Sequence, residues 1–222
     1  MAWFGPEACF VQTSNCDMLH EKAGVREDRV QEIHGSLGRL QCSAPCCDDL
    51  HRVDAAFLER LRAEPGWVPP CPKCKACLRP NVMIFNDGRL VDAHLQTQRD
   101  NMERFGERFR VARTRAPPPQ ASSSSQRGRV SPTMTTSQNW VVLEIGAGVV
   151  VPSIRVHGET FGAQGAGLVR INPSSHECAQ METGGGEGFV GLKYVPICAR
   201  SDCALAELVK QLDQPAAAKL TS

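Results

Sequence analysis

The sequence predicts an α/β protein built around a parallel sheet, because strand-like segments alternate with helical ones along the chain. Continuous apolar runs such as NWVVLEI are typical of strands that are covered on both faces. The segments typical of strands are 10–13, 29–34, 139–145 and 168–172. The segments with helical character are 17–24, 54–63, 89–113 and 201–212. The second helical segment follows an Asp cap.

The composition supports a packed core and argues against a nucleic-acid binder. Of the 222 residues 41% are hydrophobic, and 25 basic against 24 acidic residues give a net charge of +1. Direct nucleic-acid binding usually needs a basic face, so we expect none. No apolar run approaches the roughly 18 residues of a membrane helix, and the N-terminus MAWFGPEACF lacks the pattern of a secretory signal. We therefore expect an intracellular protein, cytoplasmic or nuclear.

Residues 116–138, APPPQASSSSQRGRVSPTMTTSQ, contain almost nothing that can be buried. A composition of this kind is typical of disordered, low-complexity chain. We expect a disordered insertion at this place.

The eleven cysteines include two close pairs, Cys42 with Cys46 and Cys71 with Cys74, and 24 residues lie between the pairs. In a reducing compartment, clustered cysteines indicate metal binding or redox chemistry and not disulfides. Two pairs joined by such a loop supply the four thiolates of a tetrahedral zinc site. Because four protein ligands leave no open position for water, the zinc would be structural.

Neighbouring cysteines leave alternatives open. Cys47 could replace Cys46, and Cys77 could be a spare ligand. We favour Cys46 because Pro45, just before it, shapes a tight turn. A redox pair formed by CPKC alone would need no second pair upstream.

Four motifs resemble the sirtuin family, and they occur in the family's order. FVQTSNCDMLHEKAG (10–24) resembles the segment with a Thr-Gln/Ser-Asn-x-Asp core, in the bacterial form with Ser14. EIHGSLGRLQC (32–42) resembles the segment that carries the catalytic histidine and leads into the first zinc ligand. CPKCKACLRPNVMIFND (71–87) is similar to the second zinc knuckle and the Arg-Pro-Asn-Val strand after it. LVRIN (168–172) resembles a late strand that ends in Ile-Asn.

Sirtuins are NAD-dependent protein-lysine deacylases, so the resemblance implies NAD and zinc as cofactors. It also implies an acyl-lysine protein or peptide as the partner, lying in a cleft between a Rossmann-type domain and a small zinc module. Residues 1–41 and 139–222 would form the Rossmann-type domain. Residues 42–115 would form the zinc module with its substrate strand, placed at Val82–Asn86, to which the peptide adds as a further strand.

The resemblance also assigns site residues. His34 would be the general base, a role that suits an imidazole with a pKa near neutral. Asn15 and Asp17 would be the catalytic pair at the nicotinamide. The residues expected to bind the cofactor are Thr13, Ser14, Asn15, Asp17, Gly146, Ala147, Gly148 and Asn172, the last of them at the adenosine ribose.

The chain departs from the family pattern in one large respect. The first strand with its Gly-Ala-Gly-x-Ser turn, and the Ile-Pro-Asp-Phe-Arg loop after it, are not found in the sequence. Since that turn normally binds the pyrophosphate, we expect an incomplete Rossmann-type sheet. The expected activity is transfer of the acyl group to ADP-ribose with release of nicotinamide. The alternative is a catalytically impaired sirtuin-like zinc protein that binds a peptide or partner without turnover.

Overall fold

The computed structural model of the chain describes residue 5 and residues 7–85, 87–114, 140–164, 167–179 and 193–213. The chain divides into two compact units, Met1–Gly106 and Glu107–Ser222. The segment 116–138, predicted to be a disordered insertion, lies outside the described residues. Among the helices that are described, none has both the length and the apolar character needed to cross a membrane.

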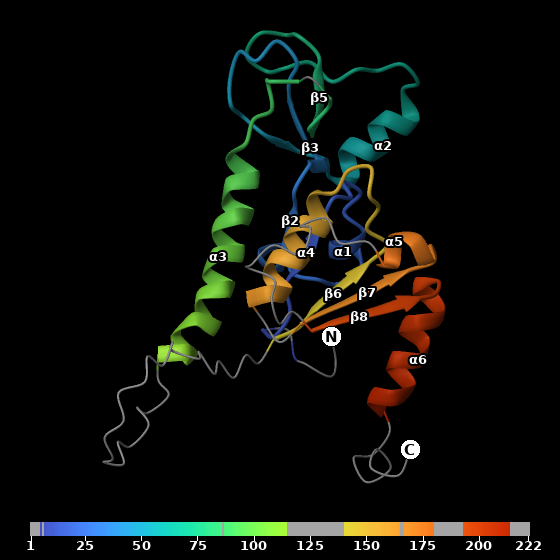
Figure 1. The fold of residues 1–222 in the computed structure, drawn as a ribbon. Coiled ribbons are helices and arrows are strands. Elements are labelled where there is room, and N and C mark those ends of the chain that lie inside the picture. The colour runs from blue at the N-terminus through green and yellow to red at the C-terminus, as the bar shows by residue number, and fades with distance from the viewer. Residues whose placement is uncertain are drawn as a thin grey trace, which may run out of the picture. The chain divides into compact units, whose positions relative to one another are not determined.

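The first unit begins with a pair of parallel strands (Figure 1). β1 (Val11–Thr13) pairs in register with β2 (Val30–Glu32). The connection contains α1 (Leu19–Lys22) and the 3-10 turn η1 (Glu27–Arg29). A parallel pair needs such a crossover, and these elements confirm the strands and the helix predicted in this stretch, in shorter form.

The second sheet of this unit is antiparallel, in the order β4-β3-β5. Its strands are β3 (Gly35–Cys42), β4 (His51–Arg52) and β5 (Leu78–Val82). α2 (Ala55–Ala63) follows β4, and the Asp54 carboxylate accepts a hydrogen bond from the Phe57 amide at 2.8 Å. The predicted Asp cap of this helix is therefore confirmed. The antiparallel sheet was not predicted.

The strand predicted at Val82–Asn86 is wrong in its position, because the strand β5 ends at Val82. The reason lies in Arg79, whose guanidinium forms a salt bridge with Asp87 at 2.5 Å. This pair folds the chain after Val82 back beside β5, so the residues from Met83 onward leave the sheet. The predicted helix at 89–113 is present as α3 (Ala93–Thr114).

Two buried amides hold the chain between β5 and α3. Gln41 and Asn81 are both fully buried. The Asn81 side chain donates to Gln41 Oε1 and to the Val91 carbonyl, each at 2.8 Å, and the Val91 amide donates to Gln41 Oε1 at 3.0 Å. The Gln41 side chain donates to the Arg89 carbonyl at 2.7 Å. Buried amides with this many partners fix one conformation of the backbone that they contact.

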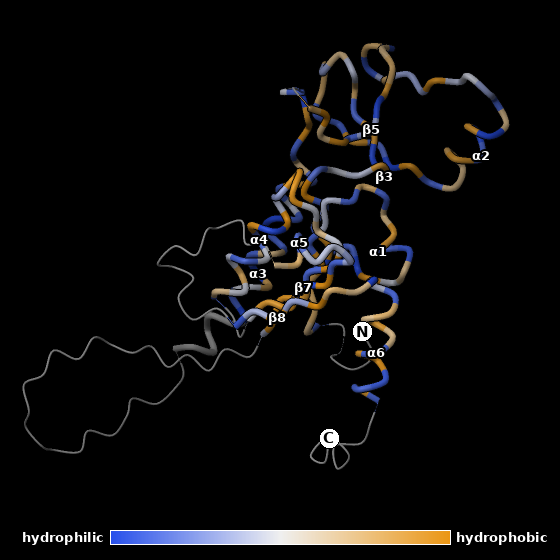
Figure 2. The backbone as a smooth tube through the Cα atoms, turned by 45° about the vertical axis from the view of Figure 1, so that its right-hand side comes forward, coloured by the Kyte–Doolittle hydropathy of each residue, from blue (hydrophilic) through white to orange (hydrophobic). Residues whose placement is uncertain are grey.

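The second unit contains a three-stranded parallel sheet in the order β6-β7-β8, which confirms the predicted α/β class. Figure 2 shows apolar residues along these strands. β6 (Val142–Ile145) is followed by α4 (Ser153–Gln164), β7 (Leu168–Asn172) by α5 (Ser175–Ala179), and β8 (Tyr194–Cys198) by α6 (Ser201–Asp213). α4 packs against β6 and β7, and α5 packs against β7 and β8.

A buried ionic group lies between α4 and the sheet. Arg170 of β7 bonds to Glu144 of β6 and, at 2.9 Å, to Glu159 of α4. All three side chains are almost completely buried. Their carboxylates raise the pKa of Arg170, against the opposing effect of burial. A buried ion pair is costly to form, but removing one partner costs more because it strands the opposite charge.

We predict that Gly35→Ala strongly destabilises the first unit. Gly35 has a φ of +89°, and a Cβ there would lie 2.2 Å from the Asn81 carbonyl oxygen. The left-handed backbone and the clash together should cost at least about 2 kcal/mol of unfolding free energy. Urea titration followed by circular dichroism measures the loss. Gly66 has the same φ with nothing within 4 Å, so Gly66→Ala should cost only about 1 kcal/mol, and equal losses would contradict the prediction.

We predict a larger effect for Arg170→Met in the second unit. The substitution keeps much of the side-chain volume but leaves the Glu144 and Glu159 carboxylates without their shared guanidinium. The expected loss is about 3–5 kcal/mol, measured by thermal and urea unfolding. Arg200→Met is the matched control, because the pair of Arg200 with Asp202 is exposed. A loss for Arg170→Met no larger than for the control would show that the buried pair does not hold this sheet.

Candidate metal centre and its neighbouring turn

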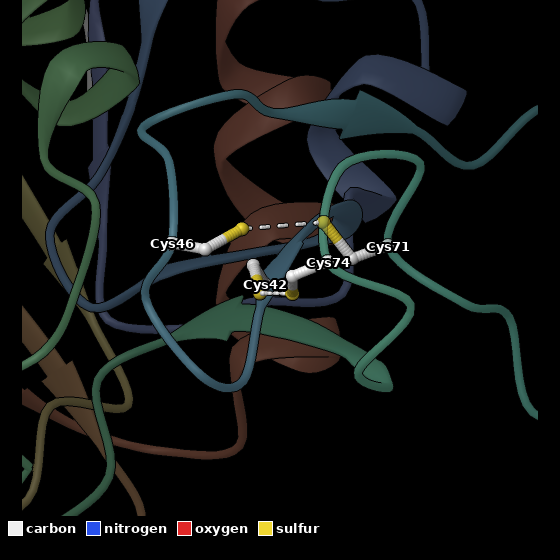
Figure 3. A group of neighbouring side chains, drawn as sticks. All are labelled: Cys42, Cys46, Cys71 and Cys74. Carbon is white, nitrogen blue, oxygen red and sulfur yellow. Dashed lines mark hydrogen bonds between the residues drawn. The ribbon is translucent and has the colours of Figure 1, made fainter.

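Four thiols converge at one end of the antiparallel sheet (Figure 3). Cys42 is the last residue of β3, and Cys46 lies in the loop after it. Cys71 and Cys74 lie in the turn that precedes β5. The ligand atoms of all four lie within 4.8 Å of one another. The Sγ atoms of Cys42 and Cys74 are 3.5 Å apart, and those of Cys46 and Cys71 are 3.6 Å apart.

These distances fit a tetrahedral zinc ion. Zinc–sulfur bonds of about 2.3 Å place neighbouring sulfurs about 3.8 Å apart in a tetrahedron. A disulfide would need about 2.05 Å. Backbone hydrogen bonds favour the thiolate, the form that binds metal, at Cys42 and Cys71, whereas the neighbouring thiols raise the pKa of Cys46. A hydrogen bond from the Cys74 backbone lowers the pKa of Cys71 to about 6, and one from the Cys46 backbone lowers the pKa of Cys42.

The loops that carry the two pairs are also joined outside the thiols. Lys73 forms a salt bridge with Asp49 at 3.0 Å, across from one loop to the other. The Lys75 amide donates to the Cys71 carbonyl at 3.0 Å, and Lys75 adopts a left-handed φ of 64°. This tight turn is what brings Cys71 and Cys74 to the same side of their loop.

Two neighbouring cysteines lie outside the group of four. The Cys47 sulfur lies 3.6 Å from that of Cys46 but is not part of the group of four. Cys77 contributes its carbonyl, which accepts from the Ser43 amide at 3.0 Å. The geometry therefore brings together the four cysteines favoured from the sequence, with Cys46 and not Cys47.

His34 lies in the turn between β2 and β3, and backbone hydrogen bonds fasten this turn to two other segments. The Ile33 amide donates to the Thr13 carbonyl at 2.9 Å, and the Leu37 amide to the Cys16 carbonyl at 2.8 Å. The His34 carbonyl accepts from the Met83 amide at 2.8 Å. The Thr13–Asp17 segment, the histidine turn and the chain after β5 therefore meet at one place, although they are far apart in sequence.

The remaining residues predicted for the catalytic segment shape its turn. The Thr13 hydroxyl accepts from the Asn15 amide at 3.0 Å, and the Asp17 carboxylate accepts from the Leu19 amide at 3.0 Å, at the start of α1. Ser14 presents its carbonyl to the Cys16 thiol at 3.8 Å. The Asn15 side chain is exposed. Turn chemistry accounts for part of the role of Thr13 and Asp17, and leaves the Asn15 amide available to a ligand.

In the second unit, the turn after β6 and the end of β7 lie together. The Ala147 carbonyl accepts from the Asn172 side chain at 3.3 Å and from Arg155 at 3.1 Å. Asn172 is buried, donates to Glu177 at 3.0 Å and accepts from the Ser174 amide at 2.9 Å. Gly146 has a φ of +65°, and a Cβ built at Gly146 or Gly148 would meet nothing within 4 Å. The predicted residues thus form one supported turn with open space over its glycines.

Gln41 was not predicted from the sequence, although it acts with Arg79 and Asn81 to position the chain after β5. Gln41 stands next to Cys42 of the thiol group, in the stretch GSLGRLQC of β3. A polar residue at a strand position between apolar neighbours is a usable signal of a buried hydrogen-bonded amide. Asn81 Oδ1 is buried without a partner.

The fold and the thiol group define a class of protein: an α/β chain in which one strand joins a four-cysteine, zinc-type module to a histidine-bearing turn. Comparison with known protein families then identifies a family that part of the chain resembles. Residues 6–105 match the model of the Sir2 family. This segment, a little under half of the chain, is thus similar to the Sir2, or sirtuin, family.

Curated relatives carry related names. An NAD-dependent protein deacetylase of Haloarcula marismortui is 40% identical over 78 residues, which cover 35% of this chain and 27% of that protein. One of Chromobacterium violaceum is 36% identical over 87 residues, 39% of this chain and 31% of that protein. An NAD-dependent protein deacylase of Thermococcus kodakarensis is 35% identical over 77 residues, 35% of this chain and 28% of that protein.

The chain thus matches less than a third of the length of these relatives. Among solved structures, a mutant Sir2 homologue in complex with ADP ribose aligns with a TM-score of 0.47 and 22% identity. That alignment covers 92% of this chain and 59% of the other.

We predict one zinc ion per chain, lost in Cys42→Ser and in Cys71→Ser. Each substitution removes one of four ligands, and a site with three thiolates holds zinc much more weakly. Metal content of the purified protein, and the thiolate-to-metal absorption after cobalt substitution, measure the change. Cys47→Ser and Cys77→Ser are matched controls and should retain full occupancy. Loss of zinc in either control would show that the ligand set is different.

Proposed function

We propose that this chain carries the catalytic turn and zinc module of an NAD-dependent protein-lysine deacylase of the sirtuin type. The observation that carries the proposal is the junction of three segments through the backbone of residues 33–37. At that junction the Thr13–Asp17 segment and the chain after Val82 both hydrogen-bond to the turn of His34. Such a junction supports the proposal, because the side chain of His34 would act as proton acceptor between a cofactor-binding loop and a substrate-binding segment.

In this proposal His34 acts as the general base. Its ring is half-buried, and both sides of its turn are pinned by main-chain bonds. A neutral imidazole accepts a proton from a ribose hydroxyl of NAD at physiological pH. The exposed amide of Asn15 and the Asp17 carboxylate would hold the nicotinamide carboxamide. Thr13 and Ser14 would contact the cofactor from the same loop.

The small-residue turn of the second unit would take the ribose and phosphate side of NAD. The Gly146 amide already donates to the Ile171 carbonyl at 2.9 Å, so the amides of Ala147 and Gly148 would be the ones to meet the cofactor. A Cβ built at Gly146 or Gly148 would meet nothing within 4 Å, so the backbone leaves room for a close approach. Asn172 would contribute mainly by holding the Ala147 carbonyl, because most of its hydrogen-bonding capacity is used inside the protein. NAD is consumed in the reaction: it supplies the ADP-ribose that receives the acyl group as nicotinamide leaves.

The substrate would be an acyl-lysine protein segment that lies along the chain after β5. Met83, Ile84 and Phe85 are 51%, 58% and 89% exposed, an unusual run for side chains of this type. A bound peptide would bury apolar side chains of its own against these three. The proposed zinc ion has no open position, so its role is to hold the sheet that carries β5.

The test is nicotinamide release from NAD in the presence of an acetyl-lysine peptide. We predict release that depends on both substrates and falls by at least about a hundredfold in His34→Ala, because general-base catalysis is typically worth 10²–10⁴. His176→Ala is the control, since His176 lies exposed on α5 of the other unit. Binding of NAD and peptide without nicotinamide release would contradict the proposal and favour a non-catalytic binding protein.

A further inference from the structure

A second candidate site lies in the first unit, behind the histidine turn. It is a small pocket of about 110 Å³, which opens beside a larger one of about 460 Å³. Glu27, Arg39 and His94 line both pockets, so the two are neighbouring chambers that share these three side chains. Met18, Glu21, Glu32, Ser36, Gly38 and Arg52 complete the lining of the smaller chamber. None of the roles proposed above uses these chambers.

Two carboxylates of the smaller chamber have oxygens without a partner. Glu32, the last residue of β2, is only 2% exposed, and its Oε1 is buried with no hydrogen bond. Glu21 Oε2 is likewise buried and unpartnered. A buried carboxylate oxygen left unpaired is costly, and such groups in native proteins usually mark an ordered water or an ion. Here two of them line one small cavity.

The positive charges of the chamber are already engaged. Arg39 and Arg52 both direct their guanidinium groups at Glu27, the latter at 3.2 Å. Within the described parts of the chain, no salt bridge reaches Glu21 or Glu32. His94 carries no charge at neutral pH, because burial lowers its pKa to about 4. The lining of the chamber thus has one more carboxyl group than guanidinium groups, with both guanidinium groups turned to Glu27. Burial raises the pKa of Glu32, and a bound cation would favour the ionised form of that carboxyl.

Hydrogen bonding fixes the shape of the chamber. The Gln98 side chain accepts from the Glu32 amide at 3.0 Å, and its Nε2 lies 3.1 Å from His94 Nε2. Since the Gln98 amide nitrogen donates, His94 Nε2 accepts and Nδ1 carries the proton. On the other side, Met18 lies directly over Gly38, where a Cβ would fall 2.0 Å from its sulfur. The site is thus walled by β3, α1 and α3.

The chemistry of this chamber favours an ammonium head group over a divalent metal. Calcium and magnesium need at least six oxygen ligands or retained waters, and among the described residues the four cysteines are the only group of three or more potential ligands close enough to share a metal. An ammonium group carries three donors, enough for the two orphan oxygens and the Ser36 hydroxyl. The larger chamber, lined by Thr97, Gln98 and Asn101, has room for a polar tail.

We propose that the chamber of Glu21 and Glu32 binds a small primary amine, with its ammonium group at the two carboxylates and a short polar tail beside His94. The proposal is independent of the deacylase activity, since it uses neither NAD nor the His34 side chain. A bound amine would link α1, β2 and α3, the elements that surround the histidine turn.

Isothermal titration of the zinc-loaded full chain with ethanolamine hydrochloride tests this site, with potassium chloride and tetramethylammonium chloride at equal ionic strength as comparisons. We expect saturable binding of ethanolamine that weakens at least about tenfold in Glu32→Gln, since a charge-assisted hydrogen bond is lost. Tetramethylammonium, which has no N–H donor, should not bind. Chemical shifts of the Glu32 and Ser36 amides should move only with ethanolamine.

Glu21→Gln provides a second variant if Glu32→Gln does not fold, and it should weaken binding in the same way. Glu64→Gln is the matched control, because Glu64 is exposed and pairs only with Arg60 on α2. Absence of saturable binding would mean that the chamber holds water alone and would overturn the proposal. Equal binding of potassium, or unchanged affinity in both glutamine variants, would overturn it as well.

Discussion

Pairing of β3 with β5 is the interaction on which the rest of the first unit depends. β3 starts directly after His34 and ends at Cys42, so a single strand of eight residues runs from the histidine turn to the thiol group. Its partner β5 follows the second cysteine pair and ends just before the exposed segment at Met83. A slip of one residue in this pairing would misplace the thiols and the histidine turn at the same time.

The pairing of β3 with β5 contains a bulge, and the bulged residues connect β3 to two other segments. Ser36 lies opposite Asn81 and Leu40 opposite Pro80, so three residues of β3 bulge between neighbouring positions of β5. Pro80 cannot donate to the sheet, which suits a position beside a bulge. The bulged residues bond elsewhere: the Leu37 amide bonds to the Cys16 carbonyl, and the Gly38 carbonyl accepts from the Val53 amide. The bulge thereby ties the strand to the Thr13–Asp17 segment on one side and to the chain after β4 on the other.

The sequence was informative where local chemistry is strong. The spacing of the cysteines, the apolar strands of the second unit and the Asp54 cap are each determined within a few residues, and the α/β class followed from them. The pairing of strands that are far apart in the sequence could not be predicted. The antiparallel β3 has no alternating apolar pattern because Gln41 and Ser36 are buried through hydrogen bonds. β8 was missed because a proline stands in its centre. α4 was missed because its buried Arg155 and Glu159 have charges that are compensated only in the folded state.

The segment between the two cysteine pairs bears on how much the length and sequence of such a module can vary. α2 buries none of its residues. Its aromatic contacts are local: Phe57 stacks on Trp67 at 5.4 Å between ring centroids, and Arg60 lies over the same indole at 4.0 Å. A segment whose contacts are mostly local can be replaced by one of different length, because the entropy of closing a loop changes little with its length. We therefore expect this segment to tolerate substitutions, insertions and deletions that leave the positions of the four thiols unchanged.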